Sequence, residues 1–485
     1  MNDKKISVKA NFIYNLLYQV ISILAPMIIA SYVSHVLGAK RVGIYSVVNA
    51  NVECFIMLGV FGLSTYSQFE VSKKRDNKNE LNQFCFESFI TRCTTIGVSL
   101  VLYFIFLAIN GGDYRLYYIL MLPLFLANLF DFSWVCQGLE NFKSVTIIYF
   151  CVKILSVILV FLFIQTTDDL IWYIVINSAA VFLSNILIFI RVMNMVKFCL
   201  YRKIRVFYHI KKSLFYFLPS IASSIIYVGD KIMLGWMVPD RCQSGYYEQA
   251  VNIECMIFMV FASLNLTMRP RLSYLYEKGK KSEIHEYLKY SLSITILFAL
   301  PAFIGLALIS DIFVPLFFGE DFIKLTPILI IMSACLFVKA VSNCLLEQSI
   351  VAKGKMKIGT FIIWVGAVTN VLLNLFMIPK MLAVGAALSS LVTEIIILVL
   401  VYVFTRKERV VDYIVNSIKK ELIAAFFMAS LICLIKYVLN DLLLEIILSV
   451  FLGGVLYFIL LILLKDSCVN SIILNLKSLI MKSGD

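Results

Sequence analysis

The sequence predicts an all-α polytopic membrane protein with about fourteen transmembrane helices. Two observations on composition predict this class: 61% of the 485 residues are apolar, and only 15% are charged. Soluble domains contain about 45–50% apolar and about 25% charged residues, because polar side chains must cover their surface. The third observation is that the apolar residues form runs long enough to cross a bilayer. Soluble enzymes, nucleic-acid-binding modules and disordered chains are therefore excluded.

Apolar runs bounded by charged or turn residues mark the expected spans in chain order. A helix needs about 20 apolar residues to cross the hydrocarbon layer. Gly, Pro and polar residues inside several runs are compatible with this, because neighbouring helices satisfy the backbone. The runs are residues 11–36, 43–67, 85–109, 116–136, 145–165, 170–190, 213–238, 246–268, 287–309, 325–348, 358–379, 383–404, 421–439 and 443–464.

Basic residues gather in alternate connecting segments, and this pattern predicts the orientation. The net charge is +13. With the N-terminus in the cytoplasm, 32 of the 43 Lys and Arg residues fall in cytoplasmic segments, 6 fall outside and 5 lie within spans. Cytoplasmic loops of membrane proteins are enriched in Lys and Arg. We therefore expect both termini in the cytoplasm, and the charge needs no nucleic-acid partner to explain it.

Cysteine and histidine give no sign of a metal centre or a disulfide framework. The twelve cysteines include no CxxC pair, and most of them lie in apolar runs. His35, His209 and His285 are scattered along the chain, without the spacing of metal ligands. We expect neither a metal nor another cofactor.

An internal repeat accompanies this topology. The motif Asn51-Val52-Glu53-Cys54 recurs as Asn252-Ile253-Glu254-Cys255, 201 residues later, and Gly43-Ile44-Tyr45 recurs as Gly245-Tyr246-Tyr247 at an offset of 202. We interpret this as a duplication of the first six spans as spans seven to twelve. Six is even, so the two halves have the same orientation. Parallel repeats of this kind are a transporter arrangement, with the substrate path between the halves.

The repeat predicts three parts of the chain. Residues 1–195 form an N-terminal lobe of six spans, and residues 196–410 form a C-terminal lobe of six spans. Residues 411–485 hold two further spans and a cytoplasmic tail. We expect the two lobes to surround a central cavity, with the last two spans outside the repeat.

Several short blocks, in their order, resemble one family. The blocks are Asn11-Phe-Ile-Tyr-Asn15, Val36-Leu-Gly38, Gly43-Ile-Tyr45, Gln137-Gly-Leu-Glu-Asn-Phe-Lys143, Asp230-Lys231-Ile-Met-Leu-Gly235, Gly245-Tyr-Tyr247, Asn374-Leu-Phe-Met-Ile-Pro379 and Gly385-Ala-Ala387. Together they resemble the bacterial polysaccharide-repeat-unit flippases of the Wzx or RfbX type. These flippases belong to the multidrug/oligosaccharidyl-lipid/polysaccharide (MOP) exporter superfamily.

The resemblance covers nearly the whole chain and implies a function. Such a protein would transfer an undecaprenyl-diphosphate-linked oligosaccharide from the inner to the outer leaflet of the bacterial cytoplasmic membrane, by alternating access. It would serve O-antigen, capsule or exopolysaccharide synthesis, without being an enzyme. Its partners would be this lipid-linked substrate, membrane lipids, and the polymerase and glycosyltransferases of the pathway, with no nucleic acid.

Four basic residues inside the spans are candidates for binding the diphosphate. Lys153 and Lys339 lie deep in their spans, Lys231 follows Asp230, and Arg92 lies near a span end. Ionisable residues inside a membrane are functional candidates, and cations facing a wet cavity would offset the desolvation of a diphosphate. The alternatives are ion pairs between helices and, for Arg92, snorkelling to the interface.

Acidic and polar residues inside the spans form a second set of candidates. Glu53, Asp131 and Glu254 could carry a proton for coupled antiport, or could pair with buried lysines. A fourth acid, Glu394, also falls within a span. Polar side chains at helical spacing could line the substrate path or bond neighbouring helices, and these are Asn11, Asn15 and Gln19.

Other functions stay open at this point. A lipid II or teichoic-acid flippase has similar requirements, and a drug or cation antiporter of the same superfamily usually has twelve spans. A membrane-embedded polymerase, ligase or acyltransferase would need a cluster of acid and base groups. The sequence contains no HExxH, GxSxG, Walker or DxD motif for such chemistry.

Overall fold

The structure is a computed structural model of the chain. It describes the backbone of residues 8–198, 204–406, 410–439, 441–466 and 468–471. Side chains are described in these ranges from residue 25 onward, apart from those of residues 142 and 410–417. All regular structure in these ranges is helical, as the composition predicts.

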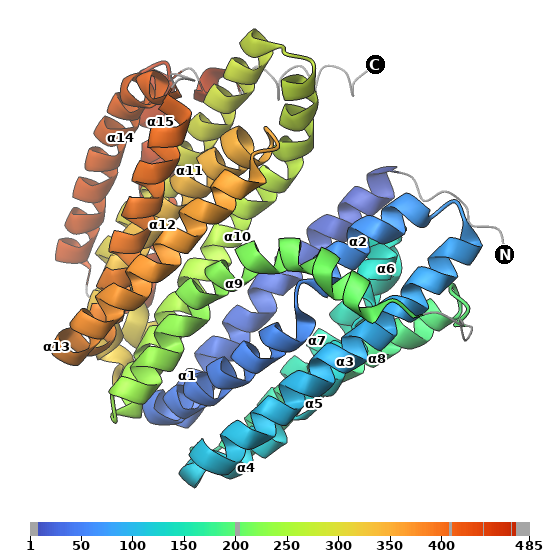
Figure 1. Cartoon of the computed structure of the whole chain (residues 1–485). Coiled ribbons are helices and arrows are strands. Elements are labelled where there is room, and N and C mark those ends of the chain that lie inside the picture. The colour runs from blue at the N-terminus through green and yellow to red at the C-terminus, as the bar shows by residue number, and fades with distance from the viewer. Residues whose placement is uncertain (1–7, 199–203, 407–409, 440, 467, 472–485) are drawn as a thin grey trace. The chain divides into compact units, whose positions relative to one another are not determined.

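The described residues divide into two compact units, residues 1–245 and 246–485. Figure 1 labels the helices of both units along the chain. The helices up to the end of the first unit are α1 (Val8–Val60), α2 (Leu63–Lys74), α3 (Lys78–Asn110), η1 (Gly112–Tyr114), α4 (Arg115–Leu120), α5 (Pro123–Leu129), α6 (Ser133–Gly138), α7 (Phe142–Phe163), α8 (Leu170–Met193) and α9 (Val206–Met237).

The second unit contains the remaining helices. A helix that begins just before the boundary leads into it, and a short π-helical segment follows α12. The helices are α10 (Arg241–Glu277), α11 (Lys281–Phe318), η2 (Glu320–Leu325), α12 (Thr326–Leu345), η3 (Leu346–Val351), α13 (Met356–Thr405), α14 (Val410–Val438) and α15 (Leu442–Leu463).

Twelve helical stretches in the described residues are long and apolar enough to cross a membrane. Two of them hold fifty residues each, about 75 Å at 1.5 Å per residue, far more than a bilayer needs. The first bends at Gly38, whose φ of 72° is left-handed, and the other at Leu382, whose φ is 55°. Each break divides one stretch into two spans, so the helices fall on all fourteen predicted apolar runs.

Two predicted spans are interrupted within the membrane. Residues 116–136 form three short helices, and Pro123 begins the second of them because proline cannot donate a helical hydrogen bond. The run 43–67 crosses from α1 into α2 at Phe61 and Gly62, which have φ angles of 49° and 68°. These interruptions place backbone groups and polar side chains inside the first unit.

Helix α9 is the first span of the predicted C-terminal lobe, but it belongs to the first compact unit. This helix packs against α1, α2 and α3 of the first unit. In the second unit, α14 and α15 pack against each other and against α11. The boundary between the compact units therefore falls at residue 245 of the chain. The domain boundaries at residues 195 and 410 describe the repeat and stay predictions.

Candidate functional site

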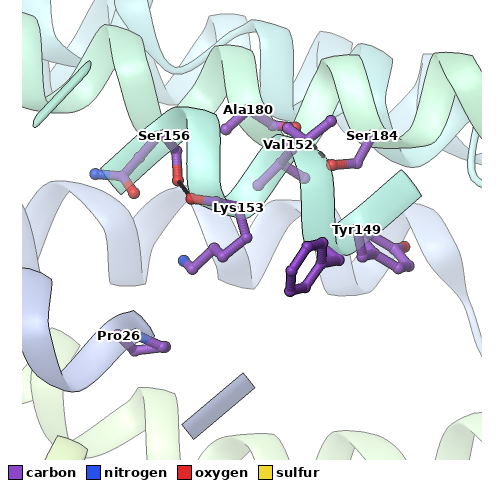
Figure 2. Close-up of a pocket in the computed structure, with 10 residues that line it drawn as sticks. Pro26, Tyr149, Val152, Lys153, Ser156, Ala180 and Ser184 are labelled. Atoms are coloured by element: carbon purple, nitrogen blue, oxygen red, sulfur yellow. Dashed lines mark hydrogen bonds between the residues drawn. The ribbon is translucent and has the colours of Figure 1, made fainter. Parts of the chain in front are cut away.

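A pocket of about 270 Å³ lies among α1, α7 and α8 of the first unit, and Lys153 lines it. Figure 2 shows the Lys153 side chain extending from α7 into the space that Pro26 of α1 borders. Lys153 is eleven residues from the start of α7 and ten from its end, so it lies near the middle of that span. An ammonium at this depth needs water or an anion.

The polar groups around Lys153 already have partners on the protein. Ser156 Oγ donates to the Lys153 carbonyl at 2.7 Å, and Asn177 Nδ2 donates to the Tyr173 carbonyl at 3.0 Å. Tyr149 Oη donates to Asn185 Oδ1 at 3.1 Å. In the part of the chain that the structure describes, no carboxylate forms an ion pair with Lys153. Its ammonium is thus available to an anion that enters the pocket.

Lys339, the second deep lysine, has a different environment. It is 4% exposed, and its Nζ donates to Glu254 Oε1 at 2.8 Å. The same Nζ lies 4.3 Å from the centroid of the Phe258 ring, which adds a cation–π interaction. Lys339 and Glu254, both predicted as candidates, are therefore brought together as a buried ion pair between α12 and α10.

Arg92 is buried and does not snorkel to the interface. Its guanidinium donates to the Asp131 carbonyl at 2.6 Å, to Asp131 Oδ2 at 3.3 Å and to Ser64 Oγ at 2.8 Å. Asp131 Oδ1 also accepts from Ser133 Oγ at 2.6 Å. Arg92 and Asp131 thus join α3 to the interruption between α5 and α6.

The contacts of the other candidate residues say less about their roles. Lys231 is half-buried on α9, next to the buried Asp230. Glu53 is exposed on α1 and accepts from Asn49 Nδ2 at 2.8 Å. The repeat-equivalent acids therefore differ, because Glu254 is buried and paired. The backbone of the polar stripe lies on α1, but its side chains, those of Asn11, Asn15 and Gln19, lie outside the described residues.

Sequence reasoning missed a buried polar network in the first unit. His209 Nε2 lies 2.7 Å from Glu87 Oε2, and its Nδ1 lies 3.0 Å from Tyr66 Oη. These residues come from α9, α3 and α2, so the network ties α9 to both neighbours. The sequence carries no signal for it, because the three residues are far apart along the chain.

A buried acid on α14 was also missed. Glu421 is fully buried, and neither of its carboxylate oxygens has a hydrogen-bond partner among the residues that the structure describes. Glu421 is the first residue of the predicted span 421–439. In the sequence it is therefore indistinguishable from a charged residue that marks the end of a span. Among the residues described, no group of three or more His, Cys, Asp or Glu side chains could hold a metal ion.

Comparison with known proteins decides the family. The family model described as "Polysaccharide biosynthesis protein" matches residues 8–276, which is more than half of the chain. The chain belongs to this family. The MatE family model matches residues 217–376. These two matches, together with relatives named as O-antigen transporters, identify a flippase of the Wzx type in the MOP exporter superfamily.

Relatives of this flippase agree over nearly their full lengths. A protein of Escherichia coli (strain K12), named as an O-antigen transporter, is 21% identical over 416 residues, covering 84% of this chain and 99% of that protein. The solved structure of the lipid II flippase MurJ in an inward closed conformation is 19% identical, with a TM-score of 0.71, and covers 93% of this chain and 99% of its own.

A multidrug resistance MATE family transporter of the MOP superfamily, solved in an inward-facing conformation, has a TM-score of 0.63 to this flippase at 12% identity. The match covers 83% of this chain and 98% of the transporter. At these identities the two structures show a shared fold alone. The Wzx-type flippase is thus a multi-pass membrane protein with the MurJ and MATE fold.

Proposed function

We propose that the protein transfers undecaprenyl-diphosphate-linked oligosaccharide repeat units from the inner to the outer leaflet of the bacterial cytoplasmic membrane. The product would feed the synthesis of O-antigen, capsule or exopolysaccharide, and transport would proceed by alternating access. The family match and the relative named as an O-antigen transporter support this proposal. The single observation that carries the site is the position of Lys153 in a pocket halfway along α7.

The chemistry of the substrate explains why such a lysine is needed. A diphosphate brings about two negative charges into a region of low dielectric constant, where an unpaired charge costs several kcal/mol. A cation without a carboxylate partner offsets this cost, because its charge is not already neutralised. Lys153 meets the requirement among the described residues, whereas Arg92 and Lys339 are held in ion pairs. Lys231, together with the Asn11, Asn15 and Gln19 stripe, stays a secondary candidate for the substrate path.

The proposed orientation places both termini in the cytoplasm. The distribution of Lys and Arg, 32 in one set of connecting segments and 6 in the other, supports it. Transport would be coupled to an ion by antiport, with Glu254 among the intramembrane acids concerned. The pathway's polymerase and glycosyltransferases would be partners in sequence, because one consumes the flipped repeat unit and the others build it.

A lipid II flippase is the second candidate, because the MurJ fold aligns with 93% of this chain. Lipid II also carries a sugar on an undecaprenyl diphosphate, so a cation near the middle of the membrane would serve it equally. Two further alternatives are a teichoic-acid flippase and a MATE-type antiporter of drugs or cations. A transport assay with different substrates distinguishes these functions.

The purified protein in sealed liposomes tests the proposal directly. Each preparation carries one labelled substrate in the leaflet that corresponds to the cytoplasmic side: an undecaprenyl-diphosphate oligosaccharide, lipid II, or a cationic dye. We expect protein-dependent appearance of the oligosaccharide lipid in the opposite leaflet, faster than lipid II and without dye movement. Transport of lipid II or dye in preference to the oligosaccharide lipid would contradict the proposal.

A further inference from the structure

Two carboxylates and one ammonium meet in the interior of the second unit. Glu254 on α10, Lys339 on α12 and Glu394 on α13 are 2%, 4% and 6% exposed. Glu394 interacts electrostatically with both other groups. With all three ionised, this triad would carry a net negative charge away from water, which is unfavourable without a further cation.

Lys339 is engaged by Glu254. Its Nζ is 2.8 Å from Glu254 Oε1 and lies over the Phe258 ring. Glu394, in contrast, forms no ion pair with any residue that the structure describes. The charge of Glu394 is therefore not offset by direct contact, although the carboxyl group is buried in the same cluster.

Ser342 indicates the protonation state of Glu394. Its Oγ lies 3.1 Å from the Lys339 carbonyl oxygen and 3.2 Å from Glu394 Oε2. A hydroxyl group has one proton to donate, and a carbonyl oxygen can only accept. If Ser342 donates to the carbonyl, the contact with Glu394 is a hydrogen bond only when the carboxyl group carries the proton. A proton on the carboxyl group therefore gives each of the two contacts a proton of its own, whereas an ionised carboxylate must share the hydroxyl proton with the carbonyl oxygen.

We propose that Glu394 is a proton-binding site of this protein, placed beside the Lys339–Glu254 ion pair. Binding forms an O–H bond at Oε2, and this group donates to Ser342 Oγ. Release transfers the proton to water and leaves a second carboxylate for Lys339 to neutralise. The charge of the triad thereby alternates between neutral and negative as one proton enters or leaves.

Two further titratable side chains lie near the triad in the part of the chain that the structure describes, Tyr247 and Cys255. Tyr247 Oη of α10 lies 3.1 Å from Ser390 Oγ, and Ser390 precedes Glu394 by one turn of α13. The Cys255 thiol lies 3.5 Å from Glu254 Oε2. The charged groups that act on Glu394 are Lys339 and Glu254, which come from two different helices.

The proton site can be tested without any transport substrate. Infrared difference spectra between acidic and alkaline buffer are recorded on the full chain in lipid nanodiscs. We expect a protonated-carboxyl C=O band that Glu394→Gln abolishes. Glu254→Gln should abolish it too, because Lys339 then has Glu394 as its carboxylate partner and keeps it ionised. The matched control is Glu320→Gln, which replaces an exposed acid in the same unit and should leave this band unchanged.

Two results would overturn the proton site. One is a band in Glu394→Gln that equals the wild-type band. The other, which decides the matter if Glu394→Gln fails to insert, is an unchanged band in Glu254→Gln. Both outcomes are independent of the transported molecule.

The role of this site in transport rests on the proposed function and has its own test. Transport of the oligosaccharide lipid by wild-type protein should change when a pH gradient is imposed, and Glu394→Gln should lose that response. If the variant keeps the response, the site does not couple protons to transport. If wild-type protein moves no oligosaccharide lipid, the proposed function fails while the infrared result stands.

Discussion

Arg92 and Asp131 hold an interrupted span to its neighbour: the guanidinium of Arg92 reaches both the backbone carbonyl and the carboxylate of Asp131. The side chains of Arg92 and Asp131 are 2% and 16% exposed, so loss of either partner leaves a largely shielded charge without its counter-charge. Breaking a buried pair in this way costs about 3–5 kcal/mol. We therefore expect Arg92→Ala and Asp131→Ala to lower the amount of folded protein in the membrane.

Size-exclusion chromatography and thermal melting of detergent-solubilised protein measure this effect. The exposed pair of Arg75 and Glu140, whose nitrogen and oxygen are 3.0 Å apart, is the matched control. Its disruption should cost about 0–1 kcal/mol, because exposed ion pairs contribute little. Equal melting temperatures for Arg92→Ala and wild type would show that the buried pair is not structural.

Gly43 and Gly245 occupy equivalent places in the predicted repeat and pack backbone against backbone. A Cβ atom on Gly43 would overlap the Arg241 carbonyl oxygen and lie 2.9 Å from the Gly245 nitrogen. We expect Gly43→Ala to abolish correct folding, since backbone atoms cannot move aside as a side chain can. Gly97→Ala, where a Cβ meets nothing within 4 Å, should express like wild type. Normal expression of Gly43→Ala would contradict the close packing.

Replacement of the buried Glu421 by an apolar residue is expected to stabilise the protein. Within the described part of the chain, the fully buried carboxyl group of Glu421 has no hydrogen-bond partner, and neither has the hydroxyl of the neighbouring Tyr457. Burial of an unpaired polar group is unfavourable. Replacing Glu421 with Leu should therefore raise the melting temperature, whereas the exposed Glu320→Leu should leave it nearly unchanged. A fall in melting temperature on Glu421→Leu would show that this carboxyl group has a stabilising partner.

The proposed topology predicts the location of reporter fusions. Fusions after Arg115, Arg241 and Lys380 should report the outside of the cell, and fusions after Lys78 and Lys280 the cytoplasm. The physical reason is the excess of Lys and Arg in the second set of segments. Alkaline phosphatase and green fluorescent protein activities check each position. A cytoplasmic signal at Lys380 would contradict the count of spans.

The fold was largely predictable because hydropathy reports contact with lipid. The apolar runs coincide with the helices, and the change of direction at Gly38 was predicted as a boundary between two spans. The interruption at Pro123 and the bend at Phe61 were not predicted, because hydropathy continues across both. A run of apolar residues indicates that a segment lies in an apolar environment. It does not indicate where the backbone of that segment is interrupted.

The candidate site was less predictable, since a sequence position does not specify a partner. Lys153 and Lys339 look equivalent as single lysines deep in apolar runs. Packing distinguishes them, because Glu254 lies 85 residues before Lys339 in sequence and contacts it in the structure. The same holds for Glu394, whose significance depends on Ser342 and Lys339 of another helix. Depth in a span identified these residues, and only the fold assigns their partners.

The role of Lys153 is the central claim, and one measurement tests it most directly. The initial rate of oligosaccharide-lipid transport in liposomes is compared for wild type, Lys153→Met, Lys153→Arg and Lys40→Met, at equal amounts of inserted protein. Lys40 is exposed, so its replacement removes the same charge away from the pocket. We expect Lys153→Met to lose at least tenfold in rate, about 1.4 kcal/mol, with Lys153→Arg partly active and Lys40→Met like wild type. A wild-type rate for Lys153→Met would contradict the account.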